Sequence, residues 1–259
     1  MKKTLLPAWL VSTMILAFIV SCTRAPVILY HDPDGIWRMK PDGSDITQIT
    51  SFGWFGEYSP DNSKIAFSEF YDAGIWVAKA DGTDPTRLTS FGSSPSWSPD
   101  GSQLVFHAGG QTGTDRAIWI MNADGTDVHQ LSTAAGSFPD WSPAGDKILF
   151  HGEVNNGIWQ INPDGSNETM LYRMGGYPAW SPDGEKIVYV DLNEWKIWVM
   201  DADGGNKKQL TDHSGMIPAW SADGSQIAYE GDGSIWIINS DGSGDHMILE
   251  EGRHPEWSK

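Results

Sequence analysis

The stretch Pro95–Phe106 reads PSWSPDGSQLVF, and close copies of it recur along the chain. Its aromatic position is filled six times, by Tyr58, Trp97, Trp141, Trp180, Trp220 and Trp257. A second mark, Ile-Trp, recurs every 38 to 43 residues, with its Trp at Trp37, Trp76, Trp119, Trp159, Trp198 and Trp236. Eleven of the 14 Trp residues lie on one of these marks. The chain therefore consists of six copies of a unit of about forty residues.

Each unit is predicted to contain four short strands. Pro-x-Trp-Ser is the first strand, and Ser-Pro-Asp-Gly is a turn in which Pro presets φ and Gly takes a positive φ. Residues 64–67 alternate as a half-buried second strand does, and residues 75–78 are the third strand. After an Asp-Gly turn, residues 87–89 are the short fourth strand.

A four-stranded sheet with two apolar faces is not stable alone in water, but radial stacking of such sheets buries both faces. The repeated Trp is the expected packing group between neighbouring sheets. We therefore predict an all-β fold, a six-bladed β-propeller of four-stranded antiparallel blades. Residues 27–30 match a second strand and residues 255–259 match a first strand, so the C-terminal strand is expected to join the N-terminal blade and close the ring.

The N-terminal residues have the build of an export signal. Lys2 and Lys3 precede an apolar run over residues 5–20, which is shorter than a membrane span. The run closes on Ile19-Val20-Ser21-Cys22, which resembles the lipobox of bacterial lipoproteins, and Cys22 is the only cysteine. We predict a lipoprotein signal peptide over 1–21, a lipidated tether over 22–26 and one propeller domain over 27–259. An uncleaved membrane anchor with an idle cysteine is the alternative.

The repeated phrases Trp-Ser-Pro-Asp-Gly, Ile-Trp and Ala-Asp-Gly-Thr resemble the WD-like propeller repeats of the TolB family over the whole mature chain. This resemblance implies a periplasmic setting, and it implies that the channel can hold calcium and accept an extended peptide. TolB proteins carry an α/β domain before the propeller, whereas here residues 23–26 alone separate Cys22 from the first strand. Contacts that depend on that domain are therefore not implied. Because Thr23 follows the cysteine, we expect the periplasmic side of an outer membrane, or otherwise the outer face of the cell membrane.

The net charge of −17 argues against nucleic acid or anionic lipid as the main partner. Carboxylates also recur at one position of the first strand, between Pro and Trp. Around the ring this position holds Glu57, Ser96, Asp140, Ala179, Ala219 and Glu256. We predict an acidic, ligand-binding channel that includes Glu57, Ser96, Asp140 and Glu256. Alternatively, these side chains face the polar edge of the neighbouring blade or water.

A second register, after the aromatic residue of the second strand, holds His31, Ser68, His107, His151, Val190 and Glu230. His31, His107, His151 and Glu230 could converge on a transition metal, as imidazole and carboxylate ligands do. The alternative is that these side chains only pack, because the second strand lies outside the first and forms a wider ring.

Aromatic residues outside the repeat register mark the loops at the face opposite the Asp-Gly turns. Variable loops on a rigid frame commonly carry specificity. We predict recognition on this loop face by Trp54, Phe55, Phe70, Tyr71 and Trp195, with simple loop packing as the alternative.

Two classes of function follow. The sequence has no Gly-x-Ser-x-Gly, His-Glu-x-x-His, P-loop or Gly-x-Gly-x-x-Gly motif, and no motif in it requires a cofactor. We therefore favour a non-catalytic, membrane-tethered, monomeric scaffold that binds an envelope protein or a basic peptide. The alternative is a metal-assisted carbohydrate-active enzyme of the polysaccharide lyase kind, or a sugar-binding propeller, which depends on the histidines and loop aromatics.

Overall fold

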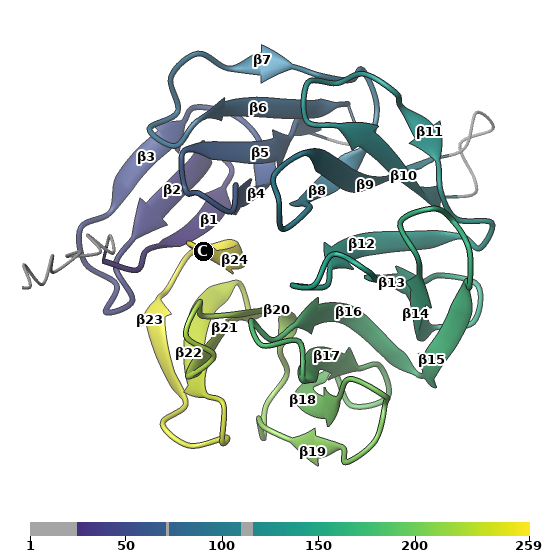
Figure 1. Cartoon of the computed structure of the whole chain (residues 1–259). Coiled ribbons are helices and arrows are strands. Elements are labelled where there is room, and N and C mark those ends of the chain that lie inside the picture. The colour runs from purple at the N-terminus through teal and green to yellow at the C-terminus, as the bar shows by residue number, and fades with distance from the viewer. Residues whose placement is uncertain (1–24, 71–72, 110–115) are drawn as a thin grey trace, which may run out of the picture.

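The computed structural model describes residues 25–70, 73–109 and 116–259, and the strands of this part of the chain form six four-stranded antiparallel sheets around a central axis (Figure 1). The predicted six-bladed propeller is confirmed. These residues contain no helix long and apolar enough to cross a membrane. Residues 1–21, Cys22 and Tyr71 lie outside the described residues, as does the tether except for its last two positions.

The four strands of each blade follow one another from the channel outward. Blade 1 is β24 (Arg253–Trp257), β1 (Ile28–Asp32), β2 (Gly35–Met39) and β3 (Thr47–Thr50), and blade 2 is β4 (Trp54–Tyr58), β5 (Lys64–Ser68), β6 (Ile75–Lys79) and β7 (Thr86–Arg87). Blade 3 is β8 (Ser93–Trp97), β9 (Gln103–Gly109), β10 (Arg116–Asn122) and β11 (His129–Gln130). Blade 4 is β12 (Gly136–Trp141), β13 (Ile148–Gly152), β14 (Gly157–Ile161) and β15 (Thr169–Arg173). Blade 5 is β16 (Gly175–Trp180), β17 (Lys186–Asp191), β18 (Lys196–Asp201) and β19 (Lys208–Gln209), and blade 6 is β20 (Met216–Trp220), β21 (Gln226–Gly231), β22 (Ser234–Asn239) and β23 (His246–Leu249).

The Ser-Pro-Asp-Gly turn is held by its own side chains. In blade 3, the Ser98 hydroxyl donates to Asp100 Oδ1 (2.7 Å) and accepts from the backbone N–H of Gln103 (2.9 Å). Asp100 Oδ1 also accepts from the N–H of Ser102 (3.0 Å), and Gly101 closes the reversal with φ of 70°. The hydrogen bond from Ser98 lowers the pKa of Asp100 to about 2. The turn therefore keeps an ionised carboxylate on this end of the propeller, which we call the turn face.

Blade 4 departs from this pattern, because Ala144 occupies the position of the turn aspartate. There the Ser142 hydroxyl donates to Asp146 Oδ1 (3.0 Å) and accepts from the backbone N–H of Lys147 (3.0 Å). A carboxylate two residues later replaces the missing one, so the serine keeps its partner and the turn keeps its shape.

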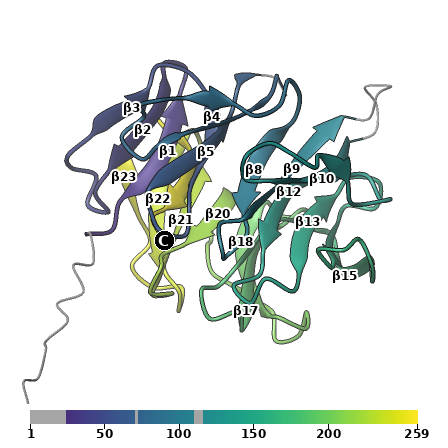
Figure 2. The same ribbon diagram turned by 45° about the horizontal axis from the view of Figure 1, so that its top comes forward.

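Six hydrophobic cores lie between the blades, one at each junction. The core between blades 2 and 3, for example, joins Ile75 and Val77 to Trp97 and Phe106. The core between blades 6 and 1 joins Ile235 and Ile237 to Trp257 and Ile28. Figure 2, in which the ring is tilted, shows neighbouring sheets lying face to face. The predicted role of the repeated first-strand aromatic residue as the packing group between blades is confirmed.

The ring is closed by the pairing of β24 with β1, in which Trp257 lies opposite Ile28 and Glu256 opposite Leu29 (Figure 1). The pairing continues beyond β24, because the N–H of Ser258 donates to the carbonyl of Val27 (2.9 Å) and the N–H of Val27 donates to Ser258 Oγ (3.1 Å). The last strand in the sequence is therefore the innermost strand of the first blade, as predicted.

Every innermost strand carries an irregularity near its start, where its register with the second strand shifts. At this point one non-glycine residue takes a φ between 48° and 55°: Phe55, Ser94, Phe138, Tyr177, Ile217 and His254. Five of these residues precede the repeated Pro, and Phe55 precedes Gly56. A bulge of this kind bends a strand and redirects a side chain. The six bulges lie at the end of the channel opposite the turn face, which we call the loop face.

We expect Asp100→Ala to lower the free energy of unfolding by about 1 kcal/mol, because the N–H of Ser102 and the hydroxyl of Ser98 each lose an acceptor at an exposed turn. Urea denaturation of the purified chain measures the change. The exposed Glu251→Ala, which also removes one negative charge, is the control. Equal stability of the two variants would contradict the role of the aspartate in the turn.

Trp257→Ala should cost about 3–5 kcal/mol, since it empties the core at the junction that closes the ring. Thermal and chemical unfolding measure the loss. Trp195→Ala is the matched control, because the Trp195 side chain is 44% exposed and its removal should change stability by about 0.5 kcal/mol or less. A loss below about 1 kcal/mol in Trp257→Ala would show that closure does not depend on this side chain.

Candidate functional site

The central channel contains a cavity of about 300 Å³ that opens on the turn face. Five of the six ring positions predicted to line the channel contact it: Glu57, Asp140, Ala179, Ala219 and Glu256. Most of its wall is apolar and consists of Trp97, Trp141, Trp180 and Trp220, together with the turn residues Pro60, Pro99, Pro143 and Pro182. Ser142, Ser258 and Lys259 also line it. The cavity is thus a pocket with apolar walls and three carboxylates.

Two of the carboxylates hold neighbouring blades together. Glu57 Oε2 accepts from the backbone N–H of Trp97 in the next blade (3.2 Å), and Asp140 Oδ2 accepts from the N–H of Trp180 (2.7 Å). In both pairs the residues are forty positions apart. One oxygen of each carboxylate therefore accepts a hydrogen bond from the adjacent blade. This contact with the polar edge of the neighbouring blade is the alternative to ligand binding that the sequence left open.

The second oxygen of Glu57 and one oxygen of Glu256 contact a cation from the chain itself. The ammonium of Lys259 lies 3.0 Å from Glu57 Oε1 and 3.0 Å from Glu256 Oε1. Burial alone lowers the pKa of Lys259, but the carboxylates of Glu256 and Glu57 outweigh it and raise this pKa above its usual value. The lysine therefore stays charged and offsets part of the negative charge in the channel. The sequence contained no signal for this contact, since Lys259 lies outside the repeat.

Burial has the largest effect on the pKa values of the Asp140 and Glu256 carboxyl groups. It raises the pKa of Asp140 to about 7, against the opposing charge of Lys259. It raises the pKa of Glu256 as well, again with Lys259 opposing. Both carboxyl groups would therefore gain from a further positive charge, because a nearby cation favours the ionised form.

A smaller cavity of about 110 Å³ lies deeper in the channel, among Glu57, Asp140, Glu256, Ser94 and Ser96. The hydroxyls of Ser94 and Ser96 are buried and have no hydrogen-bond partner among the described residues. Buried polar groups normally have a partner, which can be water or a ligand. These hydroxyls are therefore available to a polar group that enters the channel, and the structure places Ser96 with the predicted ring.

Aromatic side chains narrow the channel toward the loop face. The Phe55 ring lies 5.7 Å from Phe138 and 4.3 Å from His254, and Phe138 lies 4.8 Å from Tyr177. All four residues are at the bulge position of their innermost strands. Sequence reasoning identified Phe55 but missed the other three. The position directly before the repeated Pro was the signal that could have identified them.

The predicted loop aromatics divide into two groups. Trp54, Phe55 and Phe70 pack together and against His31, with ring centroids 5.2 Å apart for Trp54 and His31 and 5.0 Å apart for Trp54 and Phe70. Trp195 is separate from this group and is exposed. Packing thus accounts for the positions of the first three residues, and Trp195 is the one of the four described aromatics that faces solvent.

The predicted metal ligands are not brought together. His31 contacts His254, with His254 Nδ1 3.1 Å from His31 Nε2, and His254 lies 3.8 Å from Glu230 Oε2. His107 and His151 instead pack against Phe138 and Tyr177, respectively. Within residues 25–70, 73–109 and 116–259, no three His, Cys, Asp or Glu side chains form a group that could hold a metal ion. The four residues share a register, but each lies on its own blade.

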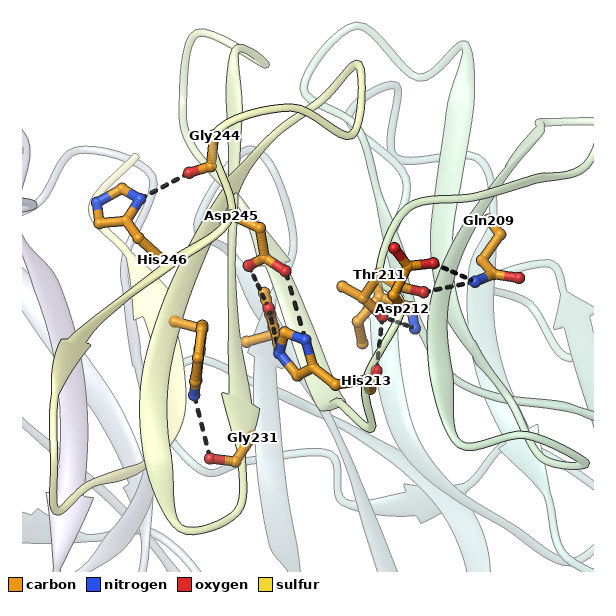
Figure 3. A network of polar contacts seen from close by, with 11 residues as sticks. Gln209, Thr211, Asp212, His213, Gly231, Gly244, Asp245 and His246 are labelled. Atoms are coloured by element: carbon orange, nitrogen blue, oxygen red, sulfur yellow. Dashed lines mark hydrogen bonds and ion pairs between the residues drawn. The ribbon is translucent and has the colours of Figure 1, made fainter.

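A polar network on blade 6 was not predicted. Figure 3 shows His213 and Asp245 pointing toward each other, with His213 Nδ1 3.6 Å from Asp245 Oδ2. The Tyr229 hydroxyl donates to Asp245 and lies 3.0 Å from His213 Nε2. The His213 ring also packs 4.6 Å from Trp236. These contacts attach the connection between blades 5 and 6 to the sheet of blade 6, so the network holds a loop in place.

We expect the buried histidines at the ring closure to make the free energy of unfolding depend on pH. Burial lowers the pKa of His31 to about 3, from an ordinary value of 6.5. The unfolded chain then binds a proton that the folded chain does not, so the free energy of unfolding should fall as pH falls from 6.5 toward 3. In His31→Phe, which keeps a ring against Trp54, this dependence should be shallower.

Urea denaturation at several pH values between 6.5 and about 4 measures the slope. Trp195→Ala, which changes an exposed side chain without a titratable group, should leave the slope unchanged. If His31→Phe and the native chain lose stability in parallel, the buried imidazole is not the source of the effect.

Comparison with known proteins supports the fold assignment. TolB from Acinetobacter baumannii is 21% identical to this chain with a TM-score of 0.73, and the match covers 90% of this chain and 66% of that one. The putative TolB from Agrobacterium tumefaciens is 17% identical, with a TM-score of 0.71 and coverage of 88% and 90%. Oligogalacturonate lyase from Vibrio parahaemolyticus is 12% identical, with a TM-score of 0.58 and coverage of 86% and 79%. At these identities the likeness shows the fold.

The comparison with curated proteins found no match. The sequence does match the TolB beta propeller domain family over residues 42–190, which is more than half of the chain. The match includes the second, third and fourth blades, and with them part of the repeats from which the fold was predicted. This chain therefore belongs to the TolB beta propeller domain family.

Proposed function

We propose that this chain is a non-catalytic binding protein of the bacterial cell envelope that accepts a positively charged, extended peptide segment in its channel. The observation that carries the proposal is the arrangement of Glu57, Asp140 and Glu256 in one cavity with apolar walls. Two of these carboxylates contact an ammonium group, that of Lys259, so the site accommodates a cation. Aromatic and proline walls suit the backbone and aliphatic stem of an extended peptide.

The geometry favours entry from the turn face. The larger cavity opens there, whereas Phe55, Phe138, Tyr177 and His254 crowd the channel on the other side. The turn face is also rich in carboxylates, since turn aspartates such as Asp61 and Asp100 are held ionised by their serine partners. A segment rich in lysine or arginine is therefore attracted before it enters. The sequence predicted recognition on the loop face as well, and the exposed Trp195 there stays a predicted ligand contact.

Calcium in the channel stays a prediction, and the residues do not fit it in this arrangement. Carboxylate and hydroxyl oxygens are the ligands that calcium prefers. However, Glu57 and Glu256 are both engaged by Lys259, and the described residues contain no group of three suitable ligands. We therefore derive no step of peptide binding from a metal.

The setting in the envelope is proposed from the sequence and the family. The lipobox-like segment ending at Cys22 supports export, lipidation and a tether to the outer membrane or the outer face of the cell membrane. Membership of the TolB beta propeller domain family supports a partner in the same compartment. We propose a monomer whose partner is an envelope protein with a basic, extended segment.

A blocked lysine peptide tests the channel. We expect calorimetry to show that the full-length chain binds acetyl-Ala-Lys-Ala-Lys-Ala-amide, and that binding weakens by about tenfold or more when Glu57→Gln and Glu256→Gln are combined, because a buried charge contact is lost. Higher salt should weaken binding to the native chain.

The same peptide with norleucine at both lysine positions should not bind, and Glu251→Gln should bind as the native chain does. An equal affinity of the lysine and norleucine peptides would show that the channel does not recognise positive charge. Binding of the lysine peptide that is unaffected by the double substitution would place the site outside the channel.

A further inference from the structure

The residues that follow the closing strand place a lysine over the channel. Ser258 is held to Val27 by two hydrogen bonds. The backbone of Lys259 is held in turn by Asn62 of blade 2, because its N–H donates to Asn62 Oδ1 (2.9 Å) and Asn62 Nδ2 donates to its carbonyl oxygen. The backbone of Lys259 is therefore fixed between blades 1 and 2, at the edge of the cavity.

The side chain of Lys259 reaches from this anchor to the carboxylates. Its ammonium lies 3.0 Å from one oxygen of Glu57 and 3.0 Å from one oxygen of Glu256, and charge attraction extends to Asp140. It therefore occupies the position in which a cationic side chain of a bound peptide would meet the same three groups.

The contact is open to exchange. The Lys259 side chain is 39% exposed, whereas that of Glu57 is 10% exposed. The carboxylates thus lie at the bottom and the lysine lies toward solvent. Because a lysine side chain has a flexible four-carbon stem, the ammonium can leave the carboxylates while the backbone keeps its hydrogen bonds. The hydrogen bonds of Ser258 and of the Lys259 backbone do not involve the ammonium, so this exchange does not require the ring to open.

We propose that Lys259 is an internal, displaceable ligand of the channel, which occupies the cation site until a lysine or arginine side chain of the partner replaces it. This inference rests on the proposed function and adds its regulation. While Lys259 occupies the site, a cationic peptide cannot bind there. Its apparent association constant is therefore the intrinsic constant multiplied by the fraction of time that the site is free. It also selects against uncharged segments, since displacement of Lys259 without a replacement leaves Glu57 and Glu256 without a cation.

Affinity measurements on three variants test this inference. Lys259→Met keeps the approximate length of the side chain and removes its charge, whereas Lys259→Arg keeps the charge. Lys208→Met is the control, because the Lys208 ammonium lies on the turn face outside the channel and donates to the carbonyl of Asp241. The probe is the blocked lysine peptide used above, at one salt concentration, with circular dichroism and thermal unfolding as controls for folding.

We expect Lys259→Met to bind the peptide about tenfold more tightly than the native chain, as follows if Lys259 occupies the site nine-tenths of the time. Lys208→Met should bind as the native chain does, which separates occupation of the site from the general effect of one positive charge. Lys259→Arg should bind no more tightly than the native chain.

The outcomes separate the two proposals. Equal affinities of the native chain and Lys259→Met, or weaker binding by Lys259→Met, would overturn the inference and leave the proposed function standing. A gain of the same size in Lys208→Met would also overturn it, because the effect would then be one of overall charge. Absence of binding by every variant, Lys259→Met included, would overturn the proposed function itself and the inference with it.

Discussion

Every blade of this propeller has two apolar faces, and the burial of both is the constraint on which the rest of the structure depends. Each of the six cores formed by the described residues is shared by two consecutive blades. The arrangement is complete only when the core between blades 6 and 1 exists. The pairing of β24 with β1 provides this last junction, and it thereby makes the ring a single cooperative unit.

The closed ring decides where polar groups can lie. The innermost strands surround the channel, and the side chain before the repeated aromatic residue lines it; this side chain is a carboxylate at Glu57, Asp140 and Glu256. Carboxylates are stable at this position only with partners, and they have them in the backbone of the next blade and in Lys259. The same groups thus connect blades and, in the proposed function, bind the cation. A substitution of Glu57 or Asp140 would therefore change both the contact between blades and the proposed binding site.

The two ends of the channel differ because the innermost strand differs along its length. At the turn face the strand is regular and ends in a tight turn that leaves a pocket open. Toward the loop face each strand bulges, and four of the six residues with positive φ form the aromatic group of Phe55, Phe138, Tyr177 and His254. A symmetric repeat thus produces a channel with one wide end and one crowded end.

The amino-acid sequence by itself determined the number of blades, the order of their strands, the turns and the exchange of the closing strand, because these follow from local periodicity and turn chemistry. It also placed Glu57, Asp140 and Glu256 at one register, and the ring then brought them to the same cavity. Equivalent positions in the repeat, however, do not show how far their side chains lie from the central axis. His31, His107 and His151 share a register as well, yet they lie one strand further out and stay apart.

Other features were decided by the tertiary structure alone. The sequence did not reveal that Trp54 and Phe70 pack on each other, that Phe138 and Tyr177 narrow the channel, or that Lys259 reaches Glu57. Lys259 and the pair Trp54 and Phe70 carry no repeat signal, whereas Phe138 and Tyr177 occupy equivalent positions of the repeat, which does not show where their side chains point. These contacts depend on the direction of each side chain and the distance between blades, and both exist only after the ring has closed.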